Sequence, residues 1–162
     1  MGVAGCGKST LGRAVAQRMG WPMIEGDDFH SDENRARMSA GVPLRDTDRE
    51  GWLRNLAKEL REHQDGAVLA CSALKRGYRD ILRAASPGLA FVFLNIAQDE
   101  ASERVRDRSG HFMPPELVRS QFEALEPPVD EPRVLQLDAG LSLDALTDQT
   151  VEWLMEDPGQ QA

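Results

Sequence analysis

The residues with the clearest chemical role are the first ten of the chain, which read M-G-V-A-G-C-G-K-S-T. Residues 2–9 match G-x-x-x-x-G-K-S, a loop whose glycines allow successive backbone N–H groups to converge on phosphate oxygens. In such a loop Lys8 reaches the outer phosphates of a nucleoside triphosphate, and the Ser9 hydroxyl holds Mg²⁺. Apolar residues then recur at helical spacing, so the anion is predicted to lie at a helix N-terminus. A glycine-rich turn that matches by chance is the alternative, and the four fixed positions argue against it.

Polar side chains follow two expected strands. Asp27 and His30 come after residues 21–25, and Ser72 and Lys75 come after the apolar run 67–71. In open α/β sheets the carboxyl ends of the strands line the ligand crevice. Asp27 is therefore predicted to orient and deprotonate an acceptor hydroxyl, with a helix-capping carboxylate as the alternative. For His30, a substrate contact and a structural hydrogen bond both stay open.

Two groups of arginines have both a functional and a structural interpretation. Arg49 either binds a substrate carboxylate through two hydrogen bonds or belongs to a solvated helix start, as we expect for its acidic neighbours Asp46, Asp48 and Glu50. Arginines 104, 106 and 108 precede Gly110. We interpret this segment as a lid whose arginines neutralise a transferring phosphoryl group, with Arg104 and Arg108 favoured over Arg106. The alternative is a charged helix face.

The metal prediction rests on Ser9 alone. The sequence has no HxxxH or CxxC pattern, and the run that ends at Cys71-Ser72 lacks the aspartate that usually completes Mg²⁺ binding in phosphate-loop proteins. Mg²⁺ is therefore expected on Ser9, the phosphates and water, with Asp27 in its outer shell.

The composition indicates one domain over residues 1–162. The net charge of −8 argues against a nucleic-acid or anionic-membrane surface, and no apolar run is long enough to span a membrane. An anionic ligand would therefore need a local basic site in an acidic protein. Two cysteines do not suggest a disulfide framework, which fits a reducing cytoplasm.

Strands alternate with helices along the chain, which predicts an α/β fold with a parallel sheet covered on both faces. Such a loop should follow a buried central strand, yet only Met1 precedes Gly2. We expect the natural start to lie upstream, because loss of a central strand would leave its two neighbours unpaired. The expected strands are 21–25, 67–71, 89–96 and 133–138, and the expected helices are 9–19, 31–40, 47–60, 75–85, 99–108, 116–125 and 142–155.

The chain resembles the gluconokinases of the small phosphate-loop type, which are related to shikimate and adenylate kinases. The block S-A-L-K-x-x-Y-R-D within 71–80 is the most specific part of the resemblance. Four segments carry it and span almost the whole chain: 1–10 (M-G-V-A-G-C-G-K-S-T), 25–30 (E-G-D-D-F-H) with 34–53 (N-R-A-R-M-S-A-G-V-P-L-R-D-T-D-R-E-G-W-L), 71–80 (C-S-A-L-K-R-G-Y-R-D), and 110–113 (G-H-F-M) with 120–128 (S-Q-F-E-A-L-E-P-P).

The resemblance implies ATP-dependent phosphorylation of the 6-hydroxyl of D-gluconate by a cytoplasmic homodimer. It implies a three-layer sandwich like that of the nucleoside-monophosphate kinases, with strand order 2-3-1-4-5 and the first strand missing from this chain. Substrate-binding helices would span about 31–64 and a lid about 104–115. The implied site residues are Gly2, Val3, Ala4, Gly5, Cys6, Gly7, Lys8, Ser9 and Thr10 for the triphosphate, Arg104 near the adenine, Arg108 in the lid, and Asp27, Arg49, Lys75 and Tyr78 around the acceptor. We add His30 to the substrate-binding residues from its position after the strand, and not from the resemblance.

Two other functions stay open on the sequence alone. One is a kinase for another small hydroxy acid such as shikimate, against which the 71–80 block argues. The other is a nucleotide-binding switch without an acceptor, and the chain has no guanine-reading N-K-x-D stretch that would support it.

Overall fold

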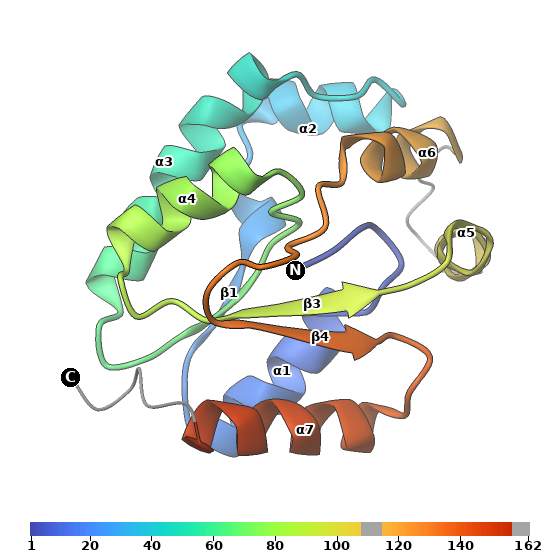
Figure 1. Ribbon diagram of the computed structural model, residues 1–162. Coiled ribbons are helices and arrows are strands. Elements are labelled where there is room, and N and C mark those ends of the chain that lie inside the picture. Colours follow the sequence, from blue (N-terminus) through green and yellow to red (C-terminus); the bar gives the residue numbers. More distant parts are fainter. Residues whose placement is uncertain (108–114, 157–162) are drawn as a thin grey trace.

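A computed structural model of the chain describes residues 1–107 and 115–156 (Figure 1). The helices and strands lie within about two residues of their predicted positions. In chain order they are α1 (Lys8–Met19), β1 (Met23–Glu25), the 3-10 turn η1 (Gly26–Phe29), α2 (Asp32–Ser39), α3 (Asp46–Glu62), β2 (Val68–Ala70), α4 (Arg76–Ala85), β3 (Phe91–Asn95), α5 (Gln98–Arg106), α6 (Pro115–Ala124), β4 (Val134–Asp138) and α7 (Leu143–Glu156).

The strands form two parallel pairs. β1 pairs with β2, with Met23 opposite Val68, and β3 pairs with β4, with Phe91 opposite Val134. The chain end at Met1 lies between the two pairs, as Figure 1 shows. The spatial order β1-β2-Met1-β3-β4 matches the predicted order 2-3-1-4-5, and the position of the first strand holds only the chain end. The α/β fold class is confirmed.

Helices cover both faces of the strands and complete three layers. α1 and α7 pack together on one face, and α3 and α4 pack together on the other (Figure 1). The first layer contributes Leu11 and Val15 to one buried cluster, and the second contributes Trp52 and Leu56 to another. Because both faces are covered, β2 and the first four residues of β3 are apolar, as the sequence predicted. In the described part of the chain, no helix is long and apolar enough to cross a membrane.

Local capping sets where the helices begin. The Ser31 hydroxyl accepts a hydrogen bond from the Asn34 N–H at 3.2 Å, which makes Ser31 the N-cap of α2. Thr47 and Glu50 have the spacing of a capping box, but they do not form it. α3 begins at Asp46, one residue before the predicted start, because the Asp48 carboxylate accepts from the Arg45 N–H at 2.9 Å.

A buried arginine connects α4 to the segment before β4. Arg79 is fully buried and donates to the carbonyls of Ala73, Leu74 and Glu126 at 2.9–3.0 Å. Its guanidinium also pairs with the carboxylate of Glu131, whose side chain is 2% exposed. The hydrogen bonds from Arg79 lower the pKa of Glu131 to about 2. These contacts hold the turn that follows β2, where the functional side chains begin.

Candidate active site

The phosphate-binding loop, residues 2–9, has a conformation that requires its glycines. Gly2 and Gly5 have φ angles of 140° and 82°. A Cβ atom on Gly5 would lie 2.6 Å from the Ala101 carbonyl oxygen, and one on Gly2 would lie 2.9 Å from the Leu94 carbonyl oxygen. The loop therefore packs its backbone directly against β3 and α5, and a side chain at either position would displace it.

The loop leads into α1 at a helix N-terminus suited to an anion. Gly7 is the N-cap and offers no capping side chain, and the first turn of α1 has no acidic residue. Lys8 Nζ donates to the Val3 carbonyl at 2.9 Å, which holds the ammonium group over the loop. The Ser9 hydroxyl lies on the same first turn. Free N–H groups, the helix dipole and a mobile ammonium together fit a polyphosphate.

Helix α6 contacts the same loop, which the sequence did not reveal. The Ala4 N–H donates to Gln121 Oε1 at 2.7 Å. Gln121 belongs to the 120–128 segment that carries part of the family resemblance. That resemblance was the only sign in the sequence that Gln121 could belong to the site. The contact connects α6 directly to the loop backbone.

The turn η1 presents Asp27 beside the loop. Asp27 is exposed on this turn, directly after β1, and Trp52 Nε1 donates to the Gly26 carbonyl at 2.7 Å to hold it. Asp27 and Lys8 both lie close enough to Cys71 to act on the pKa of its thiol, which burial raises to about 11. Asp27 and Lys8 therefore both lie near the carboxyl end of β2.

His30 is buried next to Asp27. The imidazole is 5% exposed and stacks on the Trp52 ring, with the centroids 4.6 Å apart. Its Nδ1 has no hydrogen-bond partner among the described residues. Burial lowers the pKa of His30 to about 4, so the ring is neutral at physiological pH. An unpaired buried nitrogen favours the substrate contact over the structural hydrogen bond.

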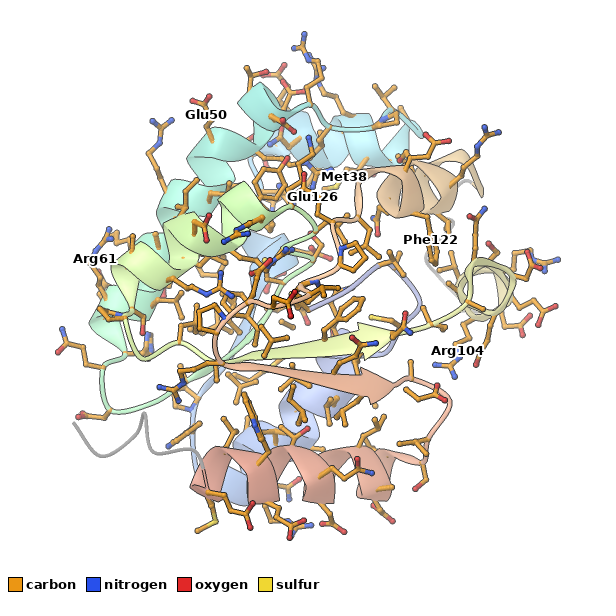
Figure 2. All side chains as sticks on the ribbon, in the orientation of Figure 1. Met38, Glu50, Arg61, Arg104, Phe122 and Glu126 are labelled. Atoms are coloured by element: carbon orange, nitrogen blue, oxygen red, sulfur yellow. The ribbon has the colours of Figure 1, made fainter. Side chains whose placement is uncertain are left out.

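Lys75 and Tyr78 meet at Asp46, at the start of α3. Lys75 Nζ lies 2.7 Å from Asp46 Oδ1, and the Tyr78 hydroxyl donates to the same oxygen at 2.5 Å. The bonds from Lys75 and Tyr78 lower the pKa of Asp46, and burial raises that of Tyr78. Asp46 lies in the exposed first turn of a helix, as the sequence predicted, and in addition binds Lys75 and Tyr78. Glu50 does lie on the outer side of α3 (Figure 2).

Arg49 faces the same group of side chains. Its guanidinium carbon lies 5.9 Å from the centre of the Tyr78 ring, and its charge acts on the pKa values of His30 and Asp46. Within residues 1–107 and 115–156, no carboxylate forms an ion pair with Arg49. The neighbouring basic residues Arg45 and Lys75 are both paired. Arg49 thus has the charge and position to bind a carboxylate from outside the chain.

Arg104 lies away from this group, at the end of β4. Its guanidinium donates to Glu100 Oε1 at 2.6 Å and to the Ala139 carbonyl at 2.9 Å, and Figure 2 shows it below α5. It therefore connects α5 to the loop after β4. Arg108 and residues 108–114 of the predicted lid lie outside the described residues.

The described residues contain no group of three or more His, Cys, Asp or Glu side chains arranged to hold a metal ion. Ser9 carries the hydroxyl that the loop motif assigns to Mg²⁺. Its position at the start of α1 is that expected for the metal-binding hydroxyl of this loop.

Together these features define a class of protein. A glycine-rich loop runs into α1, a parallel sheet lies between helices, and carboxylate, imidazole and basic groups follow the strands. This is the arrangement of a phosphate-loop kinase. A family model described as "Shikimate kinase" matches residues 4–126, which include most of the loop and the side chains Asp27, His30, Arg49, Lys75 and Tyr78.

Individual relatives identify the family to which the chain belongs within this class of kinases. The chain is 43% identical to the Mus musculus protein named "Probable gluconokinase", with 95% of each chain covered. It is 40% identical to the "Thermosensitive gluconokinase" of Escherichia coli (strain K12), covering 92% of this chain and 82% of that one. The crystal structure of a gluconokinase from Sinorhizobium meliloti 1021 superposes with a TM-score of 0.89 at 44% identity, covering 96% of this chain and 89% of that one. The chain belongs to the gluconokinase family.

Proposed function

We propose that the protein transfers the terminal phosphoryl group of ATP to the 6-hydroxyl of D-gluconate, giving 6-phospho-D-gluconate and ADP. One observation carries the proposal: the phosphate-binding loop faces a group of side chains suited to a hydroxy acid. Exposed Asp27 and Arg49, which has no ion pair among the described residues, both lie near enough to His30 to act on its pKa. Membership of the gluconokinase family supports the choice of acceptor.

The loop, residues Gly2 to Thr10, binds the triphosphate. Its backbone N–H groups and the N-terminus of α1 stabilise the phosphate oxygens, and Lys8 neutralises charge on the outer phosphates. Ser9 would hold Mg²⁺, which when bound supplies further positive charge to the phosphates. Arg104, beside the loop after β4, lies near the adenine, and Arg108 belongs to the lid.

The acceptor cluster, defined as Asp27, His30, Arg49, Lys75 and Tyr78, binds gluconate. Arg49 pairs with the carboxylate, and Lys75 and Tyr78, held by Asp46, contact the hydroxyl groups along the chain. The neutral imidazole of His30 accepts or donates one hydrogen bond through its unpaired Nδ1. These contacts fix the substrate with its 6-hydroxyl toward Asp27.

The transfer is direct and in line, without a covalent enzyme intermediate. Asp27 orients the acceptor hydroxyl and takes its proton as the oxygen bonds to phosphorus. Lys8 compensates the charge on the transferred group, and the buried walls around His30 and Trp52 exclude water from the acceptor.

The protein acts in the cytoplasm as a homodimer, without nucleic-acid or membrane partners. The family resemblance supports the dimer and the location, and the net charge of −8 supports the absence of a nucleic-acid surface. Size-exclusion chromatography with light scattering tests the dimer, and a monomeric mass would contradict it.

The function is tested by ADP release in the presence of Mg-ATP, with gluconate, shikimate or no acceptor. We expect release that depends on gluconate alone. Release with shikimate alone would show that the acceptor is wrong. Slow release that no acceptor changes would favour a nucleotide-binding protein without an acceptor.

A further inference from the structure

Helix α6 reaches the phosphate-binding loop through one side chain. The Ala4 N–H donates to Gln121 Oε1 at 2.7 Å, and the two residues lie 117 positions apart in the chain. Because a backbone N–H can only donate, the glutamine atom that faces it is the oxygen. Within the described part of the chain, no other side chain from outside the loop hydrogen-bonds to the loop backbone. Of the described side chains, Gln121 alone therefore fixes the loop backbone from outside.

The Ala4 N–H belongs to the same peptide unit as the Val3 carbonyl. A trans peptide is planar, and its N–H and C=O groups point in opposite directions. The Val3 carbonyl accepts from Lys8 Nζ at 2.9 Å and from the Cys6 N–H at 3.4 Å. Gln121 therefore lies on one side of this peptide unit and the Lys8 ammonium lies on the other. The orientation that Gln121 gives to the N–H is also the one that presents the carbonyl to Lys8.

The backbone of α6 is anchored on both sides of Gln121. Val118 is 1% exposed in the core, and Phe122 packs against the same core cluster below α6 (Figure 2). Further along, the Glu126 N–H donates to the Leu74 carbonyl at 2.9 Å, in the turn that precedes α4. The Gln121 amide therefore contacts the loop from a rigid support, as the precise placement of a neighbouring functional group requires.

We infer that Gln121 is a positioning residue for Lys8: it fixes the Val3–Ala4 peptide, and this peptide holds the Lys8 ammonium over the loop. The inference rests on the proposed role of the loop in binding ATP. Without the glutamine oxygen, the Ala4 N–H loses its partner and the peptide can rotate away from the lysine. The ammonium then occupies a wider range of positions, and its charge is less often in place for the outer phosphates.

The test measures the Kd for Mg-ATP by isothermal titration calorimetry in a double-mutant cycle of Gln121 and Lys8. Gln121→Met keeps the length of the side chain and removes the acceptor oxygen. We expect it to raise the Kd by about 10-fold in the wild-type background and by less than about 2-fold in the Lys8→Ala background. Gln149→Met makes the same change at an exposed position of α7 and should leave the Kd unchanged.

Hydrogen exchange at the Ala4 amide is a second readout, at the contact itself. Exchange should be about 10-fold faster in Gln121→Met than in the wild-type protein. In Gln121→Glu a carboxylate oxygen can still accept from the Ala4 N–H, so exchange should stay near the wild-type rate. Exchange that is equally fast in the methionine and glutamate variants would overturn the inference.

Two results of the calorimetry would also overturn it. A lower Tm in Gln121→Met with an unchanged Kd for Mg-ATP would make the role of Gln121 merely structural. An equal rise in Kd in both backgrounds would show that Gln121 acts on the nucleotide without Lys8. Its Nε2 forms no hydrogen bond with the described residues, so that result would indicate direct donation to a phosphate.

The wild-type protein separates this inference from the proposed function. A wild-type chain that does not bind Mg-ATP would overturn the proposed function and the inference with it. A wild-type chain that binds Mg-ATP with a Kd that Gln121→Met leaves unchanged would overturn the inference alone. Neither readout depends on the acceptor, so the choice of gluconate does not affect the outcome.

Discussion

Replacement of Glu131 by glutamine tests how much the buried ion pair with Arg79 contributes to the fold. The Arg79 side chain is fully buried, and Glu131 also lies 2.8 Å from Arg83. Glutamine keeps the size of the side chain but removes the negative charge. The guanidinium of Arg79 would then be a buried charge with carbonyl acceptors only, an unfavourable state in a medium of low dielectric.

The expected loss of stability follows from two independent arguments. Removal of one partner from a buried pair typically lowers the free energy of unfolding by about 3–5 kcal/mol. The pKa of Glu131, lowered from 4.5 to about 2, corresponds to about 3 kcal/mol. For a chain of this size we expect Glu131→Gln to lower the Tm by about 10 °C at pH 7.

The pH dependence has a defined sign. The folded-state pKa of Glu131 lies below its unfolded value, so the stabilisation is complete above about pH 4.5 and is lost as the pH falls toward 2. In the Glu131→Gln variant this contribution is already absent at pH 7. The difference between the wild-type protein and the variant should therefore shrink between pH 4.5 and pH 2.

Urea unfolding at several pH values measures both effects, and Glu123→Gln is the matched control. Arg119 and Glu123 form an ion pair of 2.8 Å on α6, with side chains 74% and 62% exposed. Because solvent screens this pair, we expect the control to change the free energy of unfolding by less than about 1 kcal/mol. Equal losses in the two variants, or a difference that does not change with pH, would refute the role assigned to burial.

Three further predictions concern the active site. Lys8→Ala should lower kcat by about 100-fold or more without changing the circular dichroism spectrum, and a retained kcat would remove Lys8 from the mechanism. Asp27→Asn should lower kcat by about 10²–10⁴-fold with the KM for ATP unchanged, while Asp28→Asn, on the same turn, should leave both near wild type. His30→Phe keeps a ring against Trp52 but lacks Nδ1, so steady-state kinetics should give a KM for gluconate about 10-fold higher. An unchanged KM would make the role of His30 structural.

The sequence predicted the order of the elements and the general location of the site. Lys8 and Ser9 occupy fixed positions of the G-x-x-x-x-G-K-S motif, and Asp27 follows a short strand. Both signals are local, and the topological rule for α/β sheets brings them to one edge.

Long-range pairing was beyond the sequence. The sequence around Asp46 is typical of an ordinary helix start. Only the hydrogen bonds from Lys75 and Tyr78, about thirty residues further along the chain, connect Asp46 to the candidate site. Arg79 occurs within a segment used for the family resemblance, yet nothing in its neighbours indicates complete burial. Its partner Glu131 lies 52 residues further along the chain. Such contacts depend on tertiary packing, which no short spacing pattern encodes.

The central claim is that the phosphoryl group goes to the 6-hydroxyl of gluconate. The most direct test incubates ¹³C-labelled D-gluconate with the protein and Mg-ATP and records the carbon and phosphorus NMR spectra of the product. Phosphorus coupling at carbon 6 and at its neighbour carbon 5, and at no other carbon, is the predicted result. Coupling at any of carbons 1 to 4, or no phosphorylated product while ATP is consumed, would contradict the account.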